Sequence, residues 1–446
     1  MRSKVAGRGN VLWKDCEGKG RAKMLRGRHR EHRWALRALL SVFIFAFLFA
    51  AIPVSAHQAE SNRQFTLQIY GNANEDDTID MRDVTYIKLV IFGKKPETAL
   101  CDANYDGRVS MLDVVQTKLI IVGKEGKLTL KDFLDRTVTV EEPVRAAVLN
   151  SNFELMIYAL GAYNQVAAVS EKYREKYPLI KALIEAGKIP EDLPKIGGSL
   201  WSGLDLEKLM EVSPDCVILW AYSEADYERV EEIEEKAGIP VIAIDLDVIE
   251  DLDRAMLLLG WLFNKELEAE EIIDRMREER EKVLLRTDEV EEKVTTFLVY
   301  YLKDSEISTE GKGGVNIDIL ERINTIPVTG DIEQKYLYVS LEQVYAWDPD
   351  VIILFSMSKE TLSPDMIYNN SAWAGLKAVK NGRVCDLTGY YYSKAYGWHP
   401  GGISMRMLAL AKCAYPDLFE DIEEDEYARN LFYEYYGISF IPSDCK

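Results

Sequence analysis

Two short stretches of the chain carry oxygen-bearing side chains at the spacing of a calcium-binding loop. Each stretch places them at positions 1, 3, 5, 7, 9 and 12 of a twelve-residue loop, and the second follows the first by 30 residues. The candidate ligands are Asn72, Asn74, Asp76, Thr78, Asp80 and Asp83 in the first loop and Asp102, Asn104, Asp106, Arg108, Ser110 and Asp113 in the second. A calcium ion takes six to eight oxygen ligands, and position 7 contributes its backbone carbonyl, so an arginine is compatible there. The pattern predicts two calcium sites.

The two loops differ at position 6, where the chain must turn sharply. The second loop has Gly107 there and the first has Asp77, so we expect the second site to be the stronger one. Each loop leads into one short apolar helix, 84–92 or 114–122. A generic pair of acidic, EF-hand-like turns is the alternative interpretation, and it would bind calcium as well.

A second set of candidate binding residues is aromatic and lies in predicted loops. Several of them directly follow predicted strands, and in open α/β sheets the ligand crevice lies beyond the carboxyl ends of the strands. The candidates are Trp201, Trp220, Tyr222, Tyr300, Tyr301, Tyr390, Tyr391, Tyr392, Trp398 and His399. Tyrosine and tryptophan offer flat apolar faces with one polar tip, which suits a metal chelate such as an iron complex, haem or a corrinoid better than a bare ion. Core packing is the alternative for any one of them. Glycine and proline between 389 and 401 favour an exposed binding loop there.

The residues that most enzymes need are scarce. Beyond residue 56 the only histidines are His57 and His399, so a multi-histidine zinc or manganese site cannot be built. The sequence has no P-loop, GxSxG or HExxH motif. We therefore expect a binding protein that is not an enzyme. The net charge of −20 also argues against nucleic acid as a partner.

The elements that must position these residues form a long-range repeat. The segment 206–219 reads LEKLMEVSPDCVIL, and 135 residues later the segment 341–354 reads LEQVYAWDPDVIIL. Each is typical of an amphipathic helix, a Pro-Asp turn and a strand buried on both faces. Between them, 266–287 predicts one uninterrupted amphipathic helix, and 123–136 reads as a short linker. We predict an α/β fold: two similar lobes with mainly parallel sheets joined by one long helix, plus a small all-α calcium-loop domain.

The N-terminus has the pattern of an export signal. Before residue 57 the chain has twelve Lys or Arg and three Asp or Glu, and the uncharged apolar run 38–56 ends in Val-Ser-Ala. This pattern predicts a signal peptide over 1–56, with an uncleaved N-terminal anchor as the alternative. We expect an exported protein that is extracellular or on the cell surface. Cys385 and Cys413 could pair.

The duplicated loop and exit helix over 66–131 resembles a type I dockerin, a calcium-folded module that docks onto cohesin domains. The resemblance rests on two aligned copies of the loop, each followed by one helix. It implies a cohesin-like protein partner, contacted through loop positions 10 and 11. These are Met81-Arg82 and Met111-Leu112 rather than the Ser or Thr common in dockerins, so the class of partner stays open.

From residue 137 onward the order of elements resembles class III periplasmic binding proteins, the iron-siderophore and cobalamin group. The resemblance is carried by PKIGG at 194–198, by both repeat segments, by the long helix and by WAGLKAVKNGRVCDL at 373–387. The resemblance implies an N-lobe over 137–262, a connecting helix region over 263–290 and a C-lobe over 291–446.

The same resemblance implies a function. Proteins of this class bind a metal chelate between the lobes and deliver it to an ABC permease, with slight closure because one helix joins the lobes. Glu207 and Glu342 stand at matching positions of the repeat and would dock onto the permease. An ordinary exposed helical glutamate is the alternative for each of them. The alternative function is a cell-surface assembly protein whose lobes and dockerin-like module bind protein partners without transport.

Overall fold

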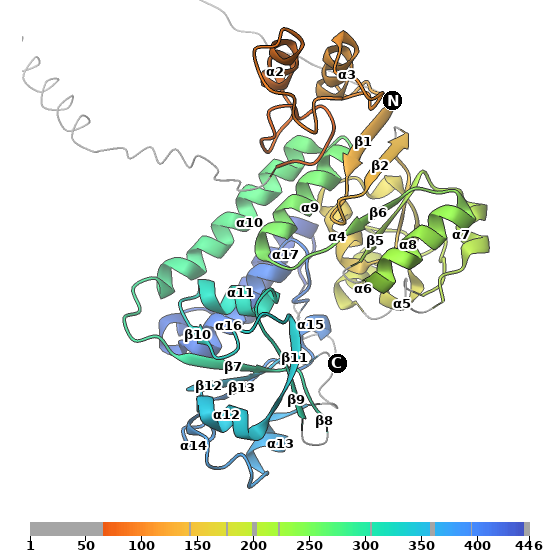
Figure 1. The fold of residues 1–446 in the computed structure, drawn as a ribbon. Helices are drawn as coiled ribbons and strands as arrows, with labels where there is room; N and C mark the ends of the chain where they lie inside the picture. The colour runs from red at the N-terminus through yellow and green to blue at the C-terminus, as the bar shows by residue number, and fades with distance from the viewer. Residues whose placement is uncertain are drawn as a thin grey trace, which may run out of the picture. The chain divides into compact units, whose positions relative to one another are not determined.

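Figure 1 shows the computed structural model of the chain. The structure describes residues 66–141, 144–174, 177–198, 203–221, 224–303, 306–356, 362–393 and 395–440. The predicted signal peptide or anchor, 1–56, lies outside the described residues. Among the helices that the structure does describe, none combines the length and the apolar character needed to cross a membrane.

The two predicted calcium loops each lead into one helix, α2 (Met81–Ile91) or α3 (Met111–Ile121). Each helix begins with a capping box, formed by Asp80 with Asp83 in α2 and by Ser110 with Asp113 in α3. The residue at loop position 12 is therefore also the third residue of the helix. Loop and helix start are built from the same side chains, so neither can change alone.

The stretch expected to be a linker instead begins a β-hairpin. Strand β1 (Lys127–Lys131) pairs antiparallel with β2 (Thr137–Glu141), and Leu130 also bridges to Ile69, which precedes the first loop. Because β1 lies within 66–131, the prediction of an all-α domain there was wrong. The two valines of Thr-Val-Thr-Val in β2 are buried and the two threonines exposed, the alternation of a strand with one face on a core.

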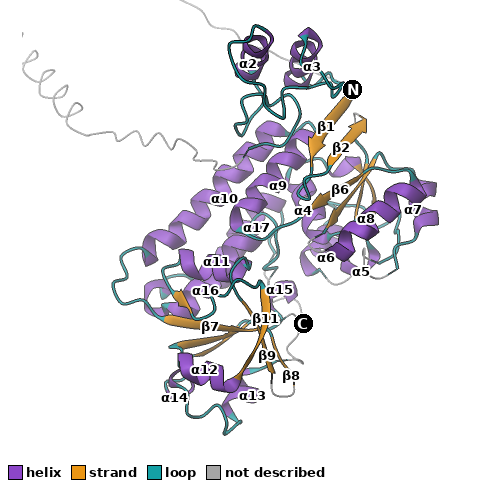
Figure 2. Ribbon diagram, in the orientation of Figure 1, coloured by secondary structure: helices purple, strands orange, loops and turns teal. Residues whose placement is uncertain are grey.

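The N-lobe is a parallel sheet covered by helices, as the βαβ pattern predicts (Figure 2). Its four strands lie in the order β4-β3-β5-β6. The strands are β3 (Ala146–Val148), β4 (Val166–Val169), β5 (Cys216–Trp220) and β6 (Val241–Ile244). The helices are α4 (Ser151–Ala159), η1 (Tyr163–Gln165), α5 (Glu171–Arg174), α6 (Pro178–Glu185), α7 (Leu206–Val212), α8 (Glu224–Ala237) and α9 (Ile249–Leu262).

The C-lobe repeats this parallel sheet, in the order β10-β7-β12-β13, and adds an antiparallel sheet β11-β9-β8 that the sequence did not predict. The strands are β7 (Thr295–Val299), β8 (Tyr301–Lys303), β9 (Glu306–Glu310), β10 (Ile326–Pro327), β11 (Tyr336–Ser340), β12 (Val351–Leu354) and β13 (Val384–Asp386). The helices are α11 (Val315–Arg322), α12 (Leu341–Trp347), α13 (Pro364–Tyr368), α14 (Lys377–Lys380), α15 (Tyr390–Ser393), α16 (Gly402–Ala414), η2 (Pro416–Phe419) and α17 (Glu424–Tyr436).

The 135-residue repeat is visible in backbone detail. Helices α7 and α12 each have seven residues and a side chain that caps the first turn, Asp205 in one and Ser340 in the other. Each ends on a residue in the left-handed conformation, Ser213 at φ 47° and Asp348 at φ 44°. The two lobes therefore present the same short helix in the same setting.

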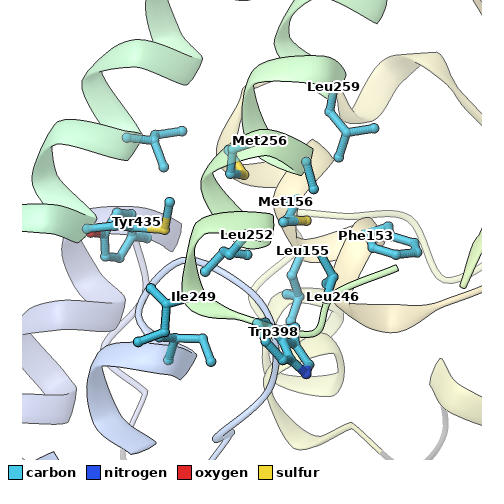
Figure 3. Packing of buried hydrophobic residues seen from close by; sticks show 14 of the residues in the cluster. Phe153, Leu155, Met156, Leu246, Ile249, Leu252, Met256, Leu259, Trp398 and Tyr435 are labelled. Carbon is cyan, nitrogen blue, oxygen red and sulfur yellow. The ribbon is translucent and has the colours of Figure 1, made fainter. Parts of the chain in front are cut away.

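Helix α10 (Glu266–Thr287) joins the lobes and spans the range expected from the sequence. One buried apolar cluster runs through both lobes, and it includes residues of α4, α9, α10, α16 and α17. Figure 3 shows part of this cluster, with labelled side chains from α4 (Phe153, Leu155, Met156), from α9 (Leu252, Met256, Leu259) and from α17 (Tyr435). The junction is therefore a continuous core, and α10 is one of several elements that hold it.

The C-lobe contains a disulfide between Cys385 of β13 and Cys413 of α16, with 5.7 Å between the two Cα atoms. The structure thus joins the two cysteines that the sequence offered as a pair. It ties the edge strand β13 to a helix of the core.

Candidate functional site

Predicted ligand residues from the two lobes meet at the junction. Trp220, at the carboxyl end of β5, contacts Phe153 of α4 and also Trp398 of the segment before α16, with 6.1 Å between ring centroids in each pair. The indole Nε1 of Trp220 donates a hydrogen bond to Oδ1 of Asp245 at 3.3 Å. The structure therefore brings together Trp220 and Trp398, which lie far apart in the sequence.

A polar network crosses the junction beside these tryptophans. Oδ1 of Asn152, in α4, accepts a hydrogen bond from the backbone N–H of Trp398 at 2.9 Å and another from the hydroxyl of Tyr177 at 3.1 Å. Nδ2 of Asn152 donates to the hydroxyl of Tyr391 at 3.1 Å. The sequence analysis missed Asn152 and Tyr177, because an amide in a predicted helix and an isolated tyrosine carry no spacing signal.

One charged residue of the junction is Arg406, in α16, which no sequence pattern indicated. Its side chain is buried, and Nε donates to the backbone carbonyl of Tyr396 at 2.9 Å, as does Nη2. Three aromatic rings surround the guanidinium, with centroids 5.3 Å (Phe355), 5.7 Å (Tyr391) and 5.8 Å (Trp398) from Cζ. The hydrogen bonds that the structure gives to Arg406 come from Nε and Nη2. The sequence feature that could have indicated this site is a single arginine in the otherwise uncharged run 402–411.

A buried carboxyl lies near this arginine. Glu310, at the end of β9, accepts a hydrogen bond from the backbone N–H of Asn316 at 3.1 Å, and Nδ2 of Asn316 donates to the hydroxyl of Tyr300 at 2.8 Å. Burial raises the pKa of Glu310 to about 7, and the hydrogen bonds from Tyr300 and Asn316 and the charge of Arg406 act in the opposite direction. Oδ1 of Asn316 is buried and unpaired within the described residues. The site thus holds one permanent cation and one carboxyl that titrates near neutral pH.

The antiparallel sheet adds a tyrosine-rich face. Tyr301 of β8 and Tyr338 of β11 both lie opposite Ser308 of the central strand β9, and their hydroxyls form a hydrogen bond. Tyr336, two residues before Tyr338, contacts the ring of Tyr300 with centroids 6.2 Å apart. Tyr336 and Tyr338 are about half exposed, at 54% and 52%. Of this group, the sequence predicted only Tyr300 and Tyr301.

The stretch 390–399 is not the exposed loop that its glycine and proline content suggested. It begins with helix α15, and Tyr396, Trp398 and His399 are buried. The ring of Tyr390 packs against Tyr396, 5.5 Å between centroids. The stretch is buried because it packs against the N-lobe, where Oδ1 of Asn152 accepts a hydrogen bond from the backbone N–H of Trp398.

His399 lies in the core, away from the role expected for it. Its Nδ1 is 2.9 Å from the hydroxyl of Tyr436 in α17. Burial lowers the pKa of His399 to about 4, so the ring is neutral at physiological pH. Trp201 and Tyr222 lie outside the described residues, as does the side chain of Tyr392, so their predicted roles stay predictions.

Glu207 and Glu342 occupy the first turns of α7 and α12, and both side chains are exposed. In the C-lobe copy, hydrogen bonds with its own backbone N–H and with Ser340 lower the pKa of Glu342. The two carboxylates therefore occupy equivalent, accessible positions in the two lobes.

The first calcium loop has oxygen atoms that face inward without a complete set of partners. Oδ1 of Asn72, at position 1, is fully buried and has no hydrogen-bond partner among the described residues. Asp83, at position 12, is buried as well, and burial raises its pKa to about 6. A guanidinium competes for this loop, because Arg82 lies 3.2 Å from Asp76 and 2.9 Å from Asp80.

The second loop has the turn that its sequence predicts. Gly107 adopts φ 85°, and its N–H donates to Oδ2 of Asp102 at 2.7 Å. Asp113 accepts hydrogen bonds from the backbone N–H groups of Asn104 and Ser110, at 3.1 and 2.6 Å, and burial raises its pKa. No cluster of three or more His, Cys, Asp or Glu side chains positioned to hold a metal occurs in the described ranges.

Comparison with known proteins decides the family. The family model described as periplasmic binding protein matches residues 146–391, more than half of the chain. The chain belongs to the periplasmic binding protein family. The match begins at β3 and ends in α15, so it spans both lobes and α10. Residues 66–131, which carry the calcium loops, lie outside it.

Two relatives of this binding protein cover most of its lobes. The molybdate-binding protein MolA of Haemophilus influenzae is 24% identical over 343 residues, 71% of this chain and 92% of that protein. The vitamin B12-binding protein of Vibrio parahaemolyticus is 25% identical over 264 residues, 58% of this chain and 87% of that protein.

Solved structures agree with the two-lobe class III fold of this binding protein. MolA bound to molybdate aligns with a TM-score of 0.55 at 24% identity, covering 70% of this chain and 98% of that chain. Helicobacter pylori CeuE with bound Ni(II) aligns with a TM-score of 0.56 at 20% identity, covering 71% and 98%. These similarities establish the fold. Binding proteins of this family take a small-molecule ligand and work with an ABC permease.

Proposed function

We propose that this periplasmic binding protein captures a negatively charged metal chelate at the lobe junction and delivers it to an ABC importer. The observation that carries the proposal is the setting of Arg406. The guanidinium of Arg406 is buried among Phe355, Tyr391 and Trp398 and has therefore lost most of its hydration. Two of its nitrogens, Nε and Nη2, donate to the same backbone carbonyl, that of Tyr396. An anion that reaches the guanidinium would add a charged hydrogen-bond acceptor in surroundings that water does not solvate.

The aromatic surroundings favour a large ligand over a small one. Tyr300, Tyr301, Tyr336 and Tyr338 form a face that reaches from the buried polar group to solvent. Flat aromatic faces bind extended, partly apolar surfaces such as catechol rings or a porphyrin. Because the site is cationic at Arg406, an anionic iron complex or haem fits it better than an uncharged corrinoid.

A second candidate ligand is a small oxyanion such as molybdate. It is favoured by the 24% identity to MolA over 71% of this chain, since MolA binds molybdate. Arg406 suits an oxyanion as well as a chelate. The tyrosine face is what separates the two, because a tetrahedral oxyanion is too small to use it.

The test measures binding of haem, a ferric catecholate, sodium molybdate and cyanocobalamin to the full chain by calorimetry and visible absorbance. We expect at least one anionic ligand to bind, and Arg406→Met to weaken it about tenfold to a hundredfold, since a hydrogen bond to a charged group contributes about 1.5 to 3 kcal/mol. The matched control is Arg383→Met, because Arg383 likewise donates to a backbone carbonyl, that of Ala414 at the C-terminal end of α16, with 2.8 Å between Nη2 and the oxygen.

The outcomes separate the candidates. Weakened binding of haem or the catecholate in Arg406→Met alone supports the chelate, and weakened binding of molybdate alone supports the oxyanion. If cyanocobalamin binds tightly and with the same affinity to Arg406→Met and to the parent chain, the proposal that Arg406 selects an anionic ligand is wrong. If none of the four ligands binds or shifts the melting temperature, the alternative of a cell-surface assembly protein without transport takes precedence.

We further propose that Glu207 and Glu342 dock onto the permease. The support is their equivalence: each is exposed in the first turn of a seven-residue helix, and the two helices share their capping geometry. Two like sites in two like lobes fit a permease made of two similar halves. Export of the chain, to the cell exterior or to an anchored position on the surface, follows from this role.

For residues 66–131 we propose a dockerin-like module with two calcium sites. Asn72, Asp76 and Asp83 would hold an ion in the first loop, and Asp102, Asp106 and Asp113 would do so in the second, with the other predicted ligands completing each shell. The buried, unpaired Oδ1 of Asn72 is the observation that fits a cation. When bound, calcium neutralises the carboxylates that converge on each loop. A cohesin-like partner would contact Met81, Met111 and Leu112, which are 55%, 56% and 61% exposed.

A further inference from the structure

The tip of the β-hairpin lies on the edge of the N-lobe sheet. The backbone N–H of Phe133 donates to the carbonyl of Ala243 in β6 at 3.1 Å, and the N–H of Ala243 donates to Oδ2 of Asp132 at 3.2 Å. Strand β6 is the last strand of the order β4-β3-β5-β6. The hairpin tip therefore satisfies backbone groups that an edge strand would otherwise leave open to solvent.

Side chains of the hairpin tip strengthen this contact. Arg136 donates to Asp132 (Nε at 3.0 Å, Nη2 at 2.8 Å), to the backbone carbonyl of Val241 (2.6 Å) and to Glu234 of α8 (3.1 Å). Glu234 in turn accepts from the backbone N–H of Val241 at 3.0 Å. The carboxylate of Asp132 has no exposed surface. A network that is bonded at several points around a buried carboxylate holds one arrangement and tolerates little sliding.

Strand β1 of the hairpin is tied to the segment that leads into the first predicted calcium loop. The backbone N–H of Tyr70 donates to the carbonyl of Thr129 in β1 at 2.9 Å, and the backbone N–H of Lys131 donates to the carbonyl of Gln68 at 2.8 Å. The segment that makes these bonds is held by the loop itself, because Nδ2 of Asn72 donates to the carbonyl of Leu67 at 2.8 Å. Loop position 1 is thus two hydrogen-bonded steps away from the hairpin.

The second calcium loop contacts the same hairpin. Nε2 of Gln116, in α3, donates to the carbonyl of Lys127 at 3.1 Å. Tyr105, inside the loop, lies edge-on against Tyr70, with 4.8 Å between ring centroids. Ile69, Leu128, Leu130 and Val138 belong to the same buried cluster as the lobes. Among the described residues, the predicted calcium loops therefore contact the hairpin directly, and the hairpin contacts β6 directly.

We propose that the two calcium loops have a second function, as a structural cap that holds the edge of the N-lobe sheet. This inference rests on the calcium sites proposed above. Cation binding orders the loops, the ordered loops fix the segment 67–70 and helix α3, and these position the hairpin on β6. Calcium then stabilises the ligand-binding body as well as the docking module.

The C-lobe supplies an internal comparison. Its counterpart of β6 is β13, which ends the order β10-β7-β12-β13. That strand is tied to α16 by the disulfide between Cys385 and Cys413. The two lobes thus secure equivalent edge strands by different means, so calcium should act on one lobe only.

The experiment compares amide hydrogen exchange of the full-length chain in CaCl₂ and in EDTA. Without calcium, exchange in peptides covering 228–244 is expected to become about tenfold faster, while peptides covering 377–390 keep their rates. Calorimetric titration with CaCl₂ shows separately whether the ion binds. Arg136→Gln and Asp132→Asn should keep calcium binding but remove the calcium dependence at 228–244. Lys131→Gln is the control, since it breaks only the hairpin's own ion pair with Asp135.

Three outcomes would overturn the cap. If calcium binds and alters exchange only within 66–141, the loops do not support the lobe, although the calcium sites stand. If calcium does not bind, the proposed sites fail and the cap fails with them. If both lobes lose protection equally, the effect is a global loss of stability and is not directed through the hairpin.

Discussion

Asn152 and Trp398 are 246 residues apart in the chain, and the side chain of the first accepts a hydrogen bond from the backbone N–H of the second at 2.9 Å. The bond joins the first helix of the N-lobe to the segment before α16. Tyr158 of the same helix donates to the backbone carbonyl of Tyr436 in α17 at 3.2 Å. The lobes are therefore joined at several points besides α10, which explains why closure on a ligand should be slight.

The first prediction concerns this bond. Asn152→Ala removes the acceptor of the buried N–H of Trp398 and one hydrogen-bond partner of the hydroxyl of Tyr177, and should lower the free energy of unfolding by roughly 2 to 4 kcal/mol. Urea denaturation followed by tryptophan fluorescence measures the loss. The control is Asn381→Ala, an exposed position where we expect a change within about 0.5 kcal/mol. Equal stabilities for the two variants would mean that the junction does not depend on Asn152.

The second prediction concerns the titration of Glu310. Its pKa is raised to about 7 in the folded chain, whereas an unfolded glutamate titrates near 4.3, so the folded state holds the proton more tightly. Stability should therefore fall as the pH rises from about 4 to 7, and stay lowered above that. Glu310→Gln removes the titrating carboxyl. The free energy of unfolding of this variant, measured against the parent chain, should therefore be higher at pH 8 than at pH 5 by on the order of 2 kcal/mol.

Denaturation at a series of pH values checks this prediction. Glu306→Gln, an exposed position on the same strand, is the control and should leave the pH dependence of the parent chain in place. Parallel stability curves for Glu310→Gln and the parent chain would falsify the assignment of a neutral, buried carboxyl to Glu310.

The third prediction separates the two calcium loops. Asp102→Ala should abolish the tighter of two binding steps in a calorimetric titration with CaCl₂, because the second loop has Gly107 at its turn. Arg82→Ala should strengthen the weaker step severalfold, since it removes a guanidinium that pairs with Asp76 and Asp80. If Arg82→Ala instead affects the tighter step, the ranking of the loops is reversed.

The fourth prediction separates transport from assembly. The double variant Glu207→Lys with Glu342→Lys should keep its melting temperature and ligand affinity, because both side chains are exposed, and should lose stimulation of the permease ATPase in reconstituted membranes. The control Glu228→Lys with Glu231→Lys changes the net charge equally on the exposed side of α8. Normal stimulation by the first double variant would remove the docking role, and equal loss in both would reduce it to overall charge.

The elements of the fold were predictable where the sequence repeats itself. The 135-residue offset gave α7, β5, α12 and β12, and the unbroken apolar face gave α10, because these features depend on local periodicity. The buried state of 390–399 was not predictable, since it depends on Asn152 from the other lobe. Arg406 was missed for a similar reason: its aromatic neighbours come from two other segments, Phe355 after β12 and the stretch 390–399. The hairpin was missed because Gly123 and Gly126 directly before it, together with the lysines of this stretch, are typical of a linker.

The disulfide between Cys385 and Cys413 would make the stability of the C-lobe differ before and after export of the chain. Thiols stay reduced in the cytosol and pair in oxidising surroundings, so an exported chain would reach its translocation channel with β13 untethered. The bond closes a loop of 28 residues, a length for which cross-linking contributes about 3 to 4 kcal/mol. In an exported chain the C-lobe would therefore unfold more easily before translocation than after the disulfide has formed. The unfolded state needed for translocation would be easier to reach, and the folded C-lobe would be stabilised afterwards.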